Sequence, residues 1–285
     1  MTASSRAGLA PALVALGAAL LCAGSVWGLA FAPPEVFMGE VQRIMYVHVP
    51  TAWNAMLVLT FAFGCALCFL FTNDWKWDSR LEAALEMGVV LSLLLCTQGA
   101  IWAKPTWGVW WDWDPRLTTT AVLVFAFGGI LALRAFVDDP ARRAVWSAVA
   151  CVIAFADVPI VYFSVKWWNS LHQAQSSPET VSKAFHWPLR INAFGILFLW
   201  IGLVTFRARV AALPAWRDRR STPRRAPRCF PAAPQECLVS GVIQGGAEFV
   251  IAAYVVTAAV LSGYAASIFL RYRAEKKRVA REERP

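Results

Sequence analysis

The stretch TAWNAMLVLTFAFGCALCFLFT, residues 51–72, contains 22 consecutive residues without a charged side chain. A helix rises about 1.5 Å per residue, so a run of this length crosses the ~30 Å hydrocarbon core of a lipid bilayer. Because lipid offers the backbone no water to bond, such a run must satisfy its own N–H and C=O groups, as a helix does. The stretch therefore predicts a transmembrane helix.

Similar runs recur along the 285-residue chain, of which 58% is hydrophobic and only 16% is charged. This composition lies outside the range of ordinary soluble domains. The seven runs are approximately Leu9–Ala30, Thr51–Thr72, Leu81–Ala103, Thr118–Val137, Ala144–Val165, Leu189–Phe206 and Ala247–Leu270. We predict an all-α integral membrane protein, with a six-helix transmembrane bundle and a seventh, C-terminal hydrophobic helix. The first run is long and is followed by further spans, which favours a retained helix over a signal peptide.

Prolines mark several expected helix ends. Pro50, Pro105 and Pro188 fall where helices are predicted to start or stop, because proline lacks the backbone N–H that a helix interior uses. Pro159 lies inside the fifth run and predicts a kink there.

The runs divide the chain into three parts. Residues 1–206 form the expected six-span membrane domain, and residues 207–246 form a linker rich in Arg, Pro and Ala. Residues 247–285 form a single hydrophobic helix with a basic tail. The linker is too polar and too rich in proline to be expected to pack.

The distribution of Lys and Arg predicts the orientation of the six spans. Placing the N-terminus in the cytoplasm puts fourteen of these residues in the inner segments up to Arg228 and six in the outer loops. Basic residues favour the cytoplasmic side, so the loops 31–50, 104–117 and 166–188 are expected to face outward. The net charge of +9 is then accounted for by membrane topology, and no nucleic acid is expected as a partner.

The three histidines, His48, His172 and His186, all fall in the first and third of these outer loops. The seven cysteines avoid the outer loops. Cys65 and Cys68 have the spacing of a redox pair, but in an apolar helix they are interpreted as two small packing residues. Chemistry is therefore expected at the outer loops.

The middle outer loop and the start of the next helix read KPTWGVWWDWDPRLT, residues 104–118, with tryptophans at Trp107, Trp110, Trp111 and Trp113. Tryptophans scattered near helix ends would form only an interfacial aromatic belt. This cluster also holds a glycine, two carboxylates and Arg116 in one short segment. It favours a flat aromatic surface that stacks against a large planar apolar ligand.

Histidines on two loops beside such a surface suggest axial ligation of haem iron, since a neutral imidazole nitrogen is a common iron ligand. Two histidines would close both axial positions. An iron without an open position suits holding and passing haem better than oxidative catalysis.

The loops resemble those of the haem exporter protein C family of cytochrome c biogenesis proteins, over roughly residues 20–206. The segments Arg43–Pro50 and Ser164–Gln173 resemble the two histidine segments of the family. The family's signature W-G-x-x-W-x-W-D-x-R-L-T is matched by Trp107, Gly108, Trp111, Trp113, Asp114, Arg116, Leu117 and Thr118.

The resemblance implies that His48 and His172 are the two axial ligands of haem iron. It further implies that Asp114 and Arg116 organise the tryptophan loop, and Arg116 could pair with a haem propionate through a charge-assisted hydrogen bond. His186 matches no family histidine and is interpreted as incidental, although its position keeps it as an alternate ligand. The implied stacking platform comprises Trp107, Trp110, Trp111 and Trp113.

The family also implies partners and a location. Haem b would be held at the periplasmic face of the bacterial inner membrane and delivered to a membrane-tethered haem chaperone. An ABC ATPase and further membrane subunits would complete the complex. The chain has no Walker motif, so we expect a transport subunit that is not itself an enzyme. The alternatives are a cytochrome c haem lyase or synthetase-like subunit, whose relatives have more spans, and a plain ABC permease subunit, which needs no tryptophan platform.

The last hydrophobic segment resembles haem exporter protein D, a small single-span partner. The resemblance rests on Gly245–Tyr254, the apolar run that follows and the basic segment Arg271–Arg278. Six spans leave the linker inside, so a seventh span would put the seven Lys and Arg of the tail outside, against the usual bias. Three alternatives stay open. The last helix has an inverted orientation in the membrane, or it does not cross the membrane fully, or the chain is the read-through product of two adjoining genes whose products are normally separate.

Overall fold

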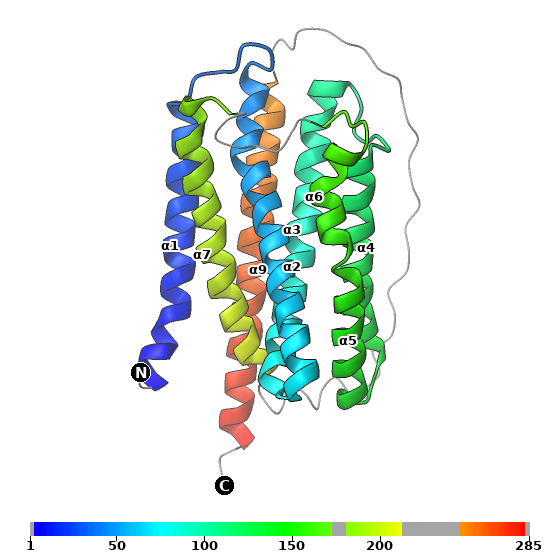
Figure 1. The fold of residues 1–285 in the computed structure, drawn as a ribbon. Helices are drawn as coiled ribbons and strands as arrows, with labels where there is room; N and C mark the ends of the chain where they lie inside the picture. Colours follow the sequence, from blue (N-terminus) through cyan, green and yellow to red (C-terminus); the bar gives the residue numbers. More distant parts are fainter. Residues whose placement is uncertain (1–2, 173–180, 213–245, 283–285) are drawn as a thin grey trace.

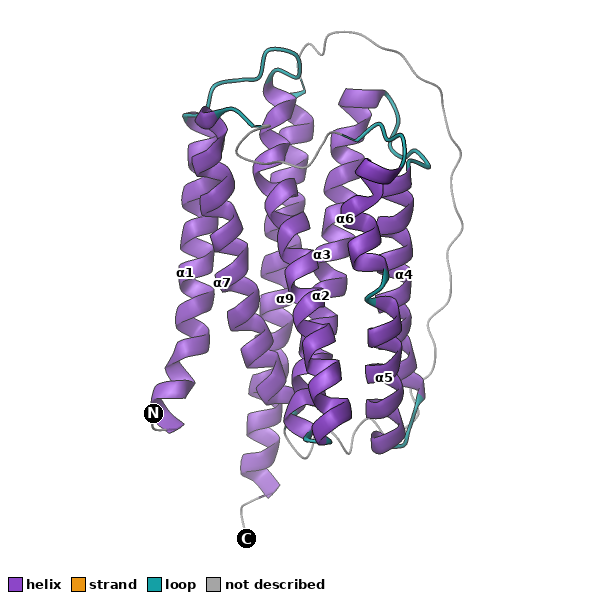
Figure 2. Ribbon diagram, viewed as in Figure 1, coloured by secondary structure: helices purple, strands orange, loops and turns teal. Residues whose placement is uncertain are grey.

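The computed structural model describes residues 3–172, 181–212 and 246–282, and these fold into an upright bundle of helices (Figure 1). The described residues contain no strand (Figure 2), and seven helical segments are long and apolar enough to cross a membrane. The predicted all-α membrane fold is therefore confirmed. The helices are α1 (Ala3–Ala30), α2 (Met45–Thr72), α3 (Trp75–Trp107), α4 (Pro115–Phe136), α5 (Pro140–Ala154), α6 (Asp157–Trp167), α7 (His186–Ala211) and α9 (Ala247–Glu282), with 3₁₀ turns η1 (Glu40–Ile44) and η2 (Lys183–Phe185).

We call the end of the bundle that holds the N-terminus the lower end, and the opposite end the upper end, as they appear in Figure 1. The described parts of the three loops expected on one side of the membrane lie together at the upper end. Two of the helices that leave this end have a proline in their first turn. α4 begins at Pro115 behind an Asp114 cap, and α7 has Pro188 in its first turn, where the missing N–H costs no hydrogen bond.

Pro50 does not mark a helix end, which corrects the sequence prediction, whereas Pro105 lies in the last turn of α3, two residues before its end. α2 starts five residues before Pro50, so residues 45–50 of the first expected loop are helical. Pro50 cannot donate to the carbonyl of Tyr46, and Asn192 of α7 donates to that carbonyl instead, at 2.7 Å. The freed backbone group is thus satisfied by a neighbouring helix, which is how membrane helices tolerate an internal proline.

The fifth run breaks into α5 and α6 at Phe155 and Ala156, where a kink at Pro159 was predicted. Pro159 has no N–H for the carbonyl of Phe155, so the break falls one turn before the proline. The two halves have different neighbours: α5 packs on α2 and α4, whereas α6 packs on α4. The break therefore carries the upper half of this span from α2 toward α4 and leaves room between α2, α4 and α6.

Close packing of small residues joins α1 to α7. A Cβ atom added at Gly17 would lie 2.5 Å from the backbone nitrogen of Leu199, and one added at Gly195 would lie 2.8 Å from that of Leu21. No side chain fits at such separations. Glycine lets the two backbones approach, which is how helices associate in lipid without a hydrophobic driving force between them.

A buried group of charges ties three helices together toward the lower end. Glu82 of α3 accepts hydrogen bonds from Arg134 of α4 at 2.9 Å and from Arg207 of α7 at 2.7 Å. Arg134 also donates to Asp78 at 2.8 Å, and Arg207 donates to Glu86 at 2.6 Å. Charges in a membrane interior are costly unless they are paired, so this network fixes the register of α3, α4 and α7.

The C-terminal helix α9 runs from the upper end to the lower end and packs on α3, η1 and α7 (Figure 1). α7 also ends at the lower end. The direction of α9 places its basic tail at the same end as the N-terminus.

Candidate functional site

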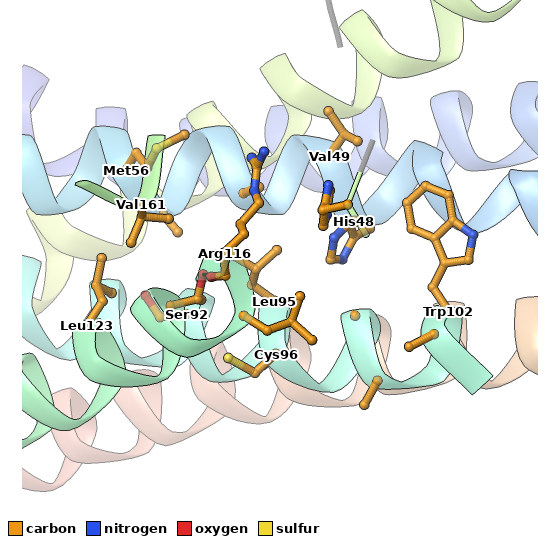
Figure 3. A pocket seen from close by; sticks show the side chains of 18 of the residues that line it. His48, Val49, Met56, Ser92, Leu95, Cys96, Trp102, Arg116, Leu123 and Val161 are labelled. Atoms are coloured by element: carbon orange, nitrogen blue, oxygen red, sulfur yellow. Dashed lines mark hydrogen bonds between the residues drawn. The ribbon is translucent and has the colours of Figure 1, made fainter. Parts of the chain in front are cut away.

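A cavity opens in the upper half of the bundle, in the space between α2, α3, α4 and α6 (Figure 3). Its walls are mostly apolar, and it extends along α2 from His48 at least to Met56, about 12 Å deeper at 1.5 Å per residue. Residues at its inner end come from all four helices. They are Met56, Ser92, Leu123 and Val161.

Two of the predicted site residues, His48 and His172, line this cavity from different segments. His48 lies in the first turn of α2 and is 8% exposed, whereas His172 follows α6. The centres of the two imidazole rings are 6.5 Å apart, and the ring planes differ by 27°. The fold thus brings together two histidines that are 124 positions apart in the sequence.

The surroundings of His48 hold its ring and leave a polar atom available. The indole of Trp102 meets the imidazole edge-on, with ring centres 5.4 Å apart. A Cβ atom added at Gly99 would lie 3.3 Å from the ring, so glycine leaves room on that side. The buried Nδ1 of His48 has no hydrogen-bond partner among the described residues. Buried polar atoms are almost always paired, so an unpaired imidazole nitrogen on a cavity wall points to a ligand.

Asp114 connects the tryptophan loop to the segment that carries His172. Its carboxylate accepts from the backbone N–H of Arg116 at 2.9 Å, which caps α4. The same carboxylate accepts from the N–H of Leu171 at 2.7 Å and from the hydroxyl of Ser170 at 3.0 Å. The Ser170 hydroxyl in turn accepts from the N–H of His172 at 3.0 Å. Asp114 is 5% exposed and fixes the backbone on both sides of the site.

We predict that Asp114→Asn weakens the binding of any ligand held by His172. Both oxygens of the carboxylate accept hydrogen bonds, whereas the nitrogen of an amide accepts none. Groups that orient a metal ligand typically contribute about 10- to 100-fold to affinity. Asp112→Asn is the matched control, since no hydrogen bond to Asp112 is seen in the described part of the chain. Haem titration of both variants checks the prediction, and equal affinities would contradict it.

The four tryptophans of the expected platform divide into two pairs. Trp107 and Trp111 line the cavity, and the ring centre of Trp107 is 6.3 Å from that of His172. Trp110 and Trp113 are 54% and 69% exposed and are not among the described residues that line the cavity. Trp113 meets Trp111 edge-on, with ring centres 5.9 Å apart. The structure thus places two indoles at the cavity and two at the surface.

Arg116 is the cationic side chain of the cavity wall, at the first turn of α4. Its Nη1 atom is buried and has no hydrogen-bond partner within the described ranges. Leaving a guanidinium nitrogen buried and unpaired is costly. The arrangement fits an anionic group of a ligand in the cavity (Figure 3).

His186 lies apart from this arrangement. Its Nε2 is 2.9 Å from the carbonyl oxygen of Val181, and it is not among the described residues that line the cavity. Cys65 and Cys68 are free thiols on α2. Trp102 and Ser170 support the two histidines, and sequence reasoning missed both because neither carries a recognisable spacing.

The fold and the cavity define a multi-span membrane protein with a cavity lined by two histidines and a pair of indoles. The family model of Heme exporter protein C matches residues 2–223. The chain belongs to this family, which confirms the resemblance seen in its loops. Membership supports a role as a handling subunit in haem export for cytochrome c biogenesis.

Several relatives are similar over most of their length. Heme exporter protein C of Haemophilus influenzae is 38% identical over 209 residues, which is 72% of this chain and 85% of that protein. The Escherichia coli K12 protein of the same name is 33% identical over 70% of this chain and 82% of its own length. That of Bradyrhizobium diazoefficiens is 35% identical over 69% and 77%. The family match ends at residue 223, so α9 lies beyond it.

Proposed function

We propose that this protein holds haem b between His48 and His172 at the outer face of a bacterial inner membrane and passes it to a haem chaperone. The observation that carries the proposal is the pair of imidazole rings, 6.5 Å apart on one cavity. An imidazole nitrogen binds a transition metal at roughly 2.0 Å, so the ring centres of two opposed ligands lie on the order of 6 Å apart. The observed separation therefore suits one iron ion between the two rings.

The cavity wall complements the rest of a haem molecule. Trp107 and Trp111 offer aromatic surface to the macrocycle, and the apolar inner end excludes water from it. Arg116 offers a buried guanidinium nitrogen to a propionate carboxylate. Trp110 and Trp113 would cover the outer rim, and Asp114 would hold His172 in position.

Two histidine ligands leave no open position on the iron, and this favours storage and transfer over oxygen chemistry. Release of haem would need one of the two histidines to dissociate from the iron. His172 is the better candidate, because it lies on a loop after α6, whereas His48 is anchored in α2. An acceptor that approaches the upper end would meet His172 and the exposed Trp113 first.

The upper end is assigned to the periplasm because Lys and Arg gather at the other end. Within this chain no Walker motif is present, so a partner ATPase would supply any ATP hydrolysis, together with the other membrane subunits of an ABC-type complex. A plain permease subunit is disfavoured by the two histidines on the cavity. A haem lyase-like subunit would share the tryptophan loop, but the family match favours the exporter.

The proposal is tested by titrating the full chain in detergent with ferric haem and, separately, with metal-free protoporphyrin. Both have the same macrocycle and propionates, so the difference reports ligation of the iron. We expect haem to bind at least about 100-fold more tightly, equivalent to roughly 2.8 kcal/mol, with a six-coordinate absorption spectrum. Equal affinities would mean that the histidines do not ligate iron.

A further inference from the structure

The C-terminal helix α9 lies outside the family match, yet its upper half packs against the elements that carry the haem site. Val250 and Ala253 are buried in one apolar cluster with Val47 and Ile101. Val47 precedes His48 in α2, and Ile101 precedes Trp102 in α3. α9 thus contacts the backbone segments that position His48 and its indole neighbour.

Two hydrogen bonds fix the register of this contact inside the membrane. Gln98 of α3 donates to the hydroxyl of Thr257 at 2.7 Å, and both side chains are buried. The hydroxyl of Tyr254 donates to the carbonyl of Arg43, in η1, at 3.2 Å. Polar contacts between helices are specific in lipid, because a wrong register would leave these groups unpaired.

A third contact reaches the tryptophan loop. The ring of Phe249 meets that of Trp110, with ring centres 6.2 Å apart. No residue of α9 lines the cavity within the described ranges. The helix therefore touches both sides of the site, the start of α2 and the tryptophan loop, without meeting the ligand itself.

We propose that α9 is a positioning element of the haem site. It packs against η1 and α2 on one side and against the tryptophan loop on the other, and these contacts set how tightly the site holds haem. This inference rests on the proposed function. It assigns to Phe249, Tyr254 and Thr257 a role in haem retention through His48 and Trp110. It also requires α9 to enter from the outer face, with the tail from Arg271 onward in the cytoplasm.

The test measures the rate at which the full chain loses haem to an excess of an apoprotein scavenger. Phe249→Ala and Thr257→Val are each expected to speed the loss about three- to tenfold, as removal of an aromatic pair or a membrane hydrogen bond allows. Ile251→Ala is the matched control, since Ile251 lies on the same helix and is 63% exposed. Phe249→Trp keeps an aromatic ring and is expected to restore slow loss.

Thermal unfolding of the same variants separates this positioning role from general destabilisation. If α9 positions the haem site, the variants lose haem faster while the midpoint of thermal unfolding of the six-span domain stays unchanged. Parental loss rates in Phe249→Ala and Thr257→Val would overturn the inference and leave haem binding by the parent intact. If the parent itself bound no haem, the proposed function would fail instead.

A tag placed after Pro285 tests the required direction of α9 independently. In spheroplasts the tag is expected to resist protease added outside and to be cut only after the membrane is opened. Cleavage in intact spheroplasts would show that the tail is outside, and the docked arrangement of α9 would then be wrong.

Discussion

Replacing either His48 or His172 with alanine is expected to lower the affinity of the full chain for haem by at least about 100-fold, since loss of a direct ligand exceeds the 10- to 100-fold cost of losing its supporting groups. Each variant leaves one imidazole on the cavity. The iron would then have one open axial position, and the six-coordinate absorption spectrum of the parent would be lost.

The matched control is His186→Ala, because the ring of His186 bonds to the carbonyl of Val181 away from the cavity. It should keep the parental spectrum and affinity. The two site variants need not behave alike: His48 is buried in α2, so its loss also leaves a hole beside Trp102. A parental spectrum in both His48→Ala and His172→Ala would remove the ligation mechanism.

Glu82→Ala is expected to lower the free energy of unfolding by about 3–5 kcal/mol, the usual cost of leaving a buried charge without its partner. Glu82 accepts from both Arg134 and Arg207, and these arginines are 1% and 0% exposed. The change therefore leaves two cations short of a carboxylate at the junction of α3, α4 and α7. Thermal unfolding in detergent measures the effect as a lower midpoint.

Lys76→Ala is the control for this prediction. The Lys76 side chain is 79% exposed and its ion pair with Asp74 is 3.7 Å long, so its removal should change the midpoint little. None of the network residues lines the cavity within the described ranges, and haem affinity in the folded fraction of Glu82→Ala should match the parent. A midpoint equal to that of the parent would show that the network does not hold the three helices together.

The number and approximate positions of the membrane helices could be predicted because lipid allows few structures, and length and apolarity decide between them. The helix ends could not be predicted as well. Pro50 lies inside α2 because Asn192, on α7, satisfies the carbonyl that the proline frees. That compensation joins residues 142 positions apart, and no local pattern reveals it.

The candidate site divides in the same way. His48, His172 and the tryptophan loop could be selected from the sequence, because histidines and clustered tryptophans are rare in apolar chains. The arrangement of these residues around the cavity could not be predicted from the sequence. The split of the tryptophans into a cavity pair and a surface pair, and the link from Asp114 to His172, depend on where α6 lies after its break at Phe155. That position follows from packing against α4.

The direction of α9 bears on the alternatives left open for the C-terminal segment. α9 runs from the upper end to the lower end, whereas a seventh span that follows α7 directly would run the other way. Its basic tail then lies on the same side as the N-terminus, as the distribution of charge favours.

The most direct test of the central claim is the position of the iron in a cryo-EM structure of the full chain loaded with haem. The account predicts one flat macrocycle in the cavity beside Trp107 and Trp111, with its iron between His48 and His172 and a propionate at Arg116. Iron bound to only one of these histidines, or haem bound elsewhere on the bundle, would contradict it.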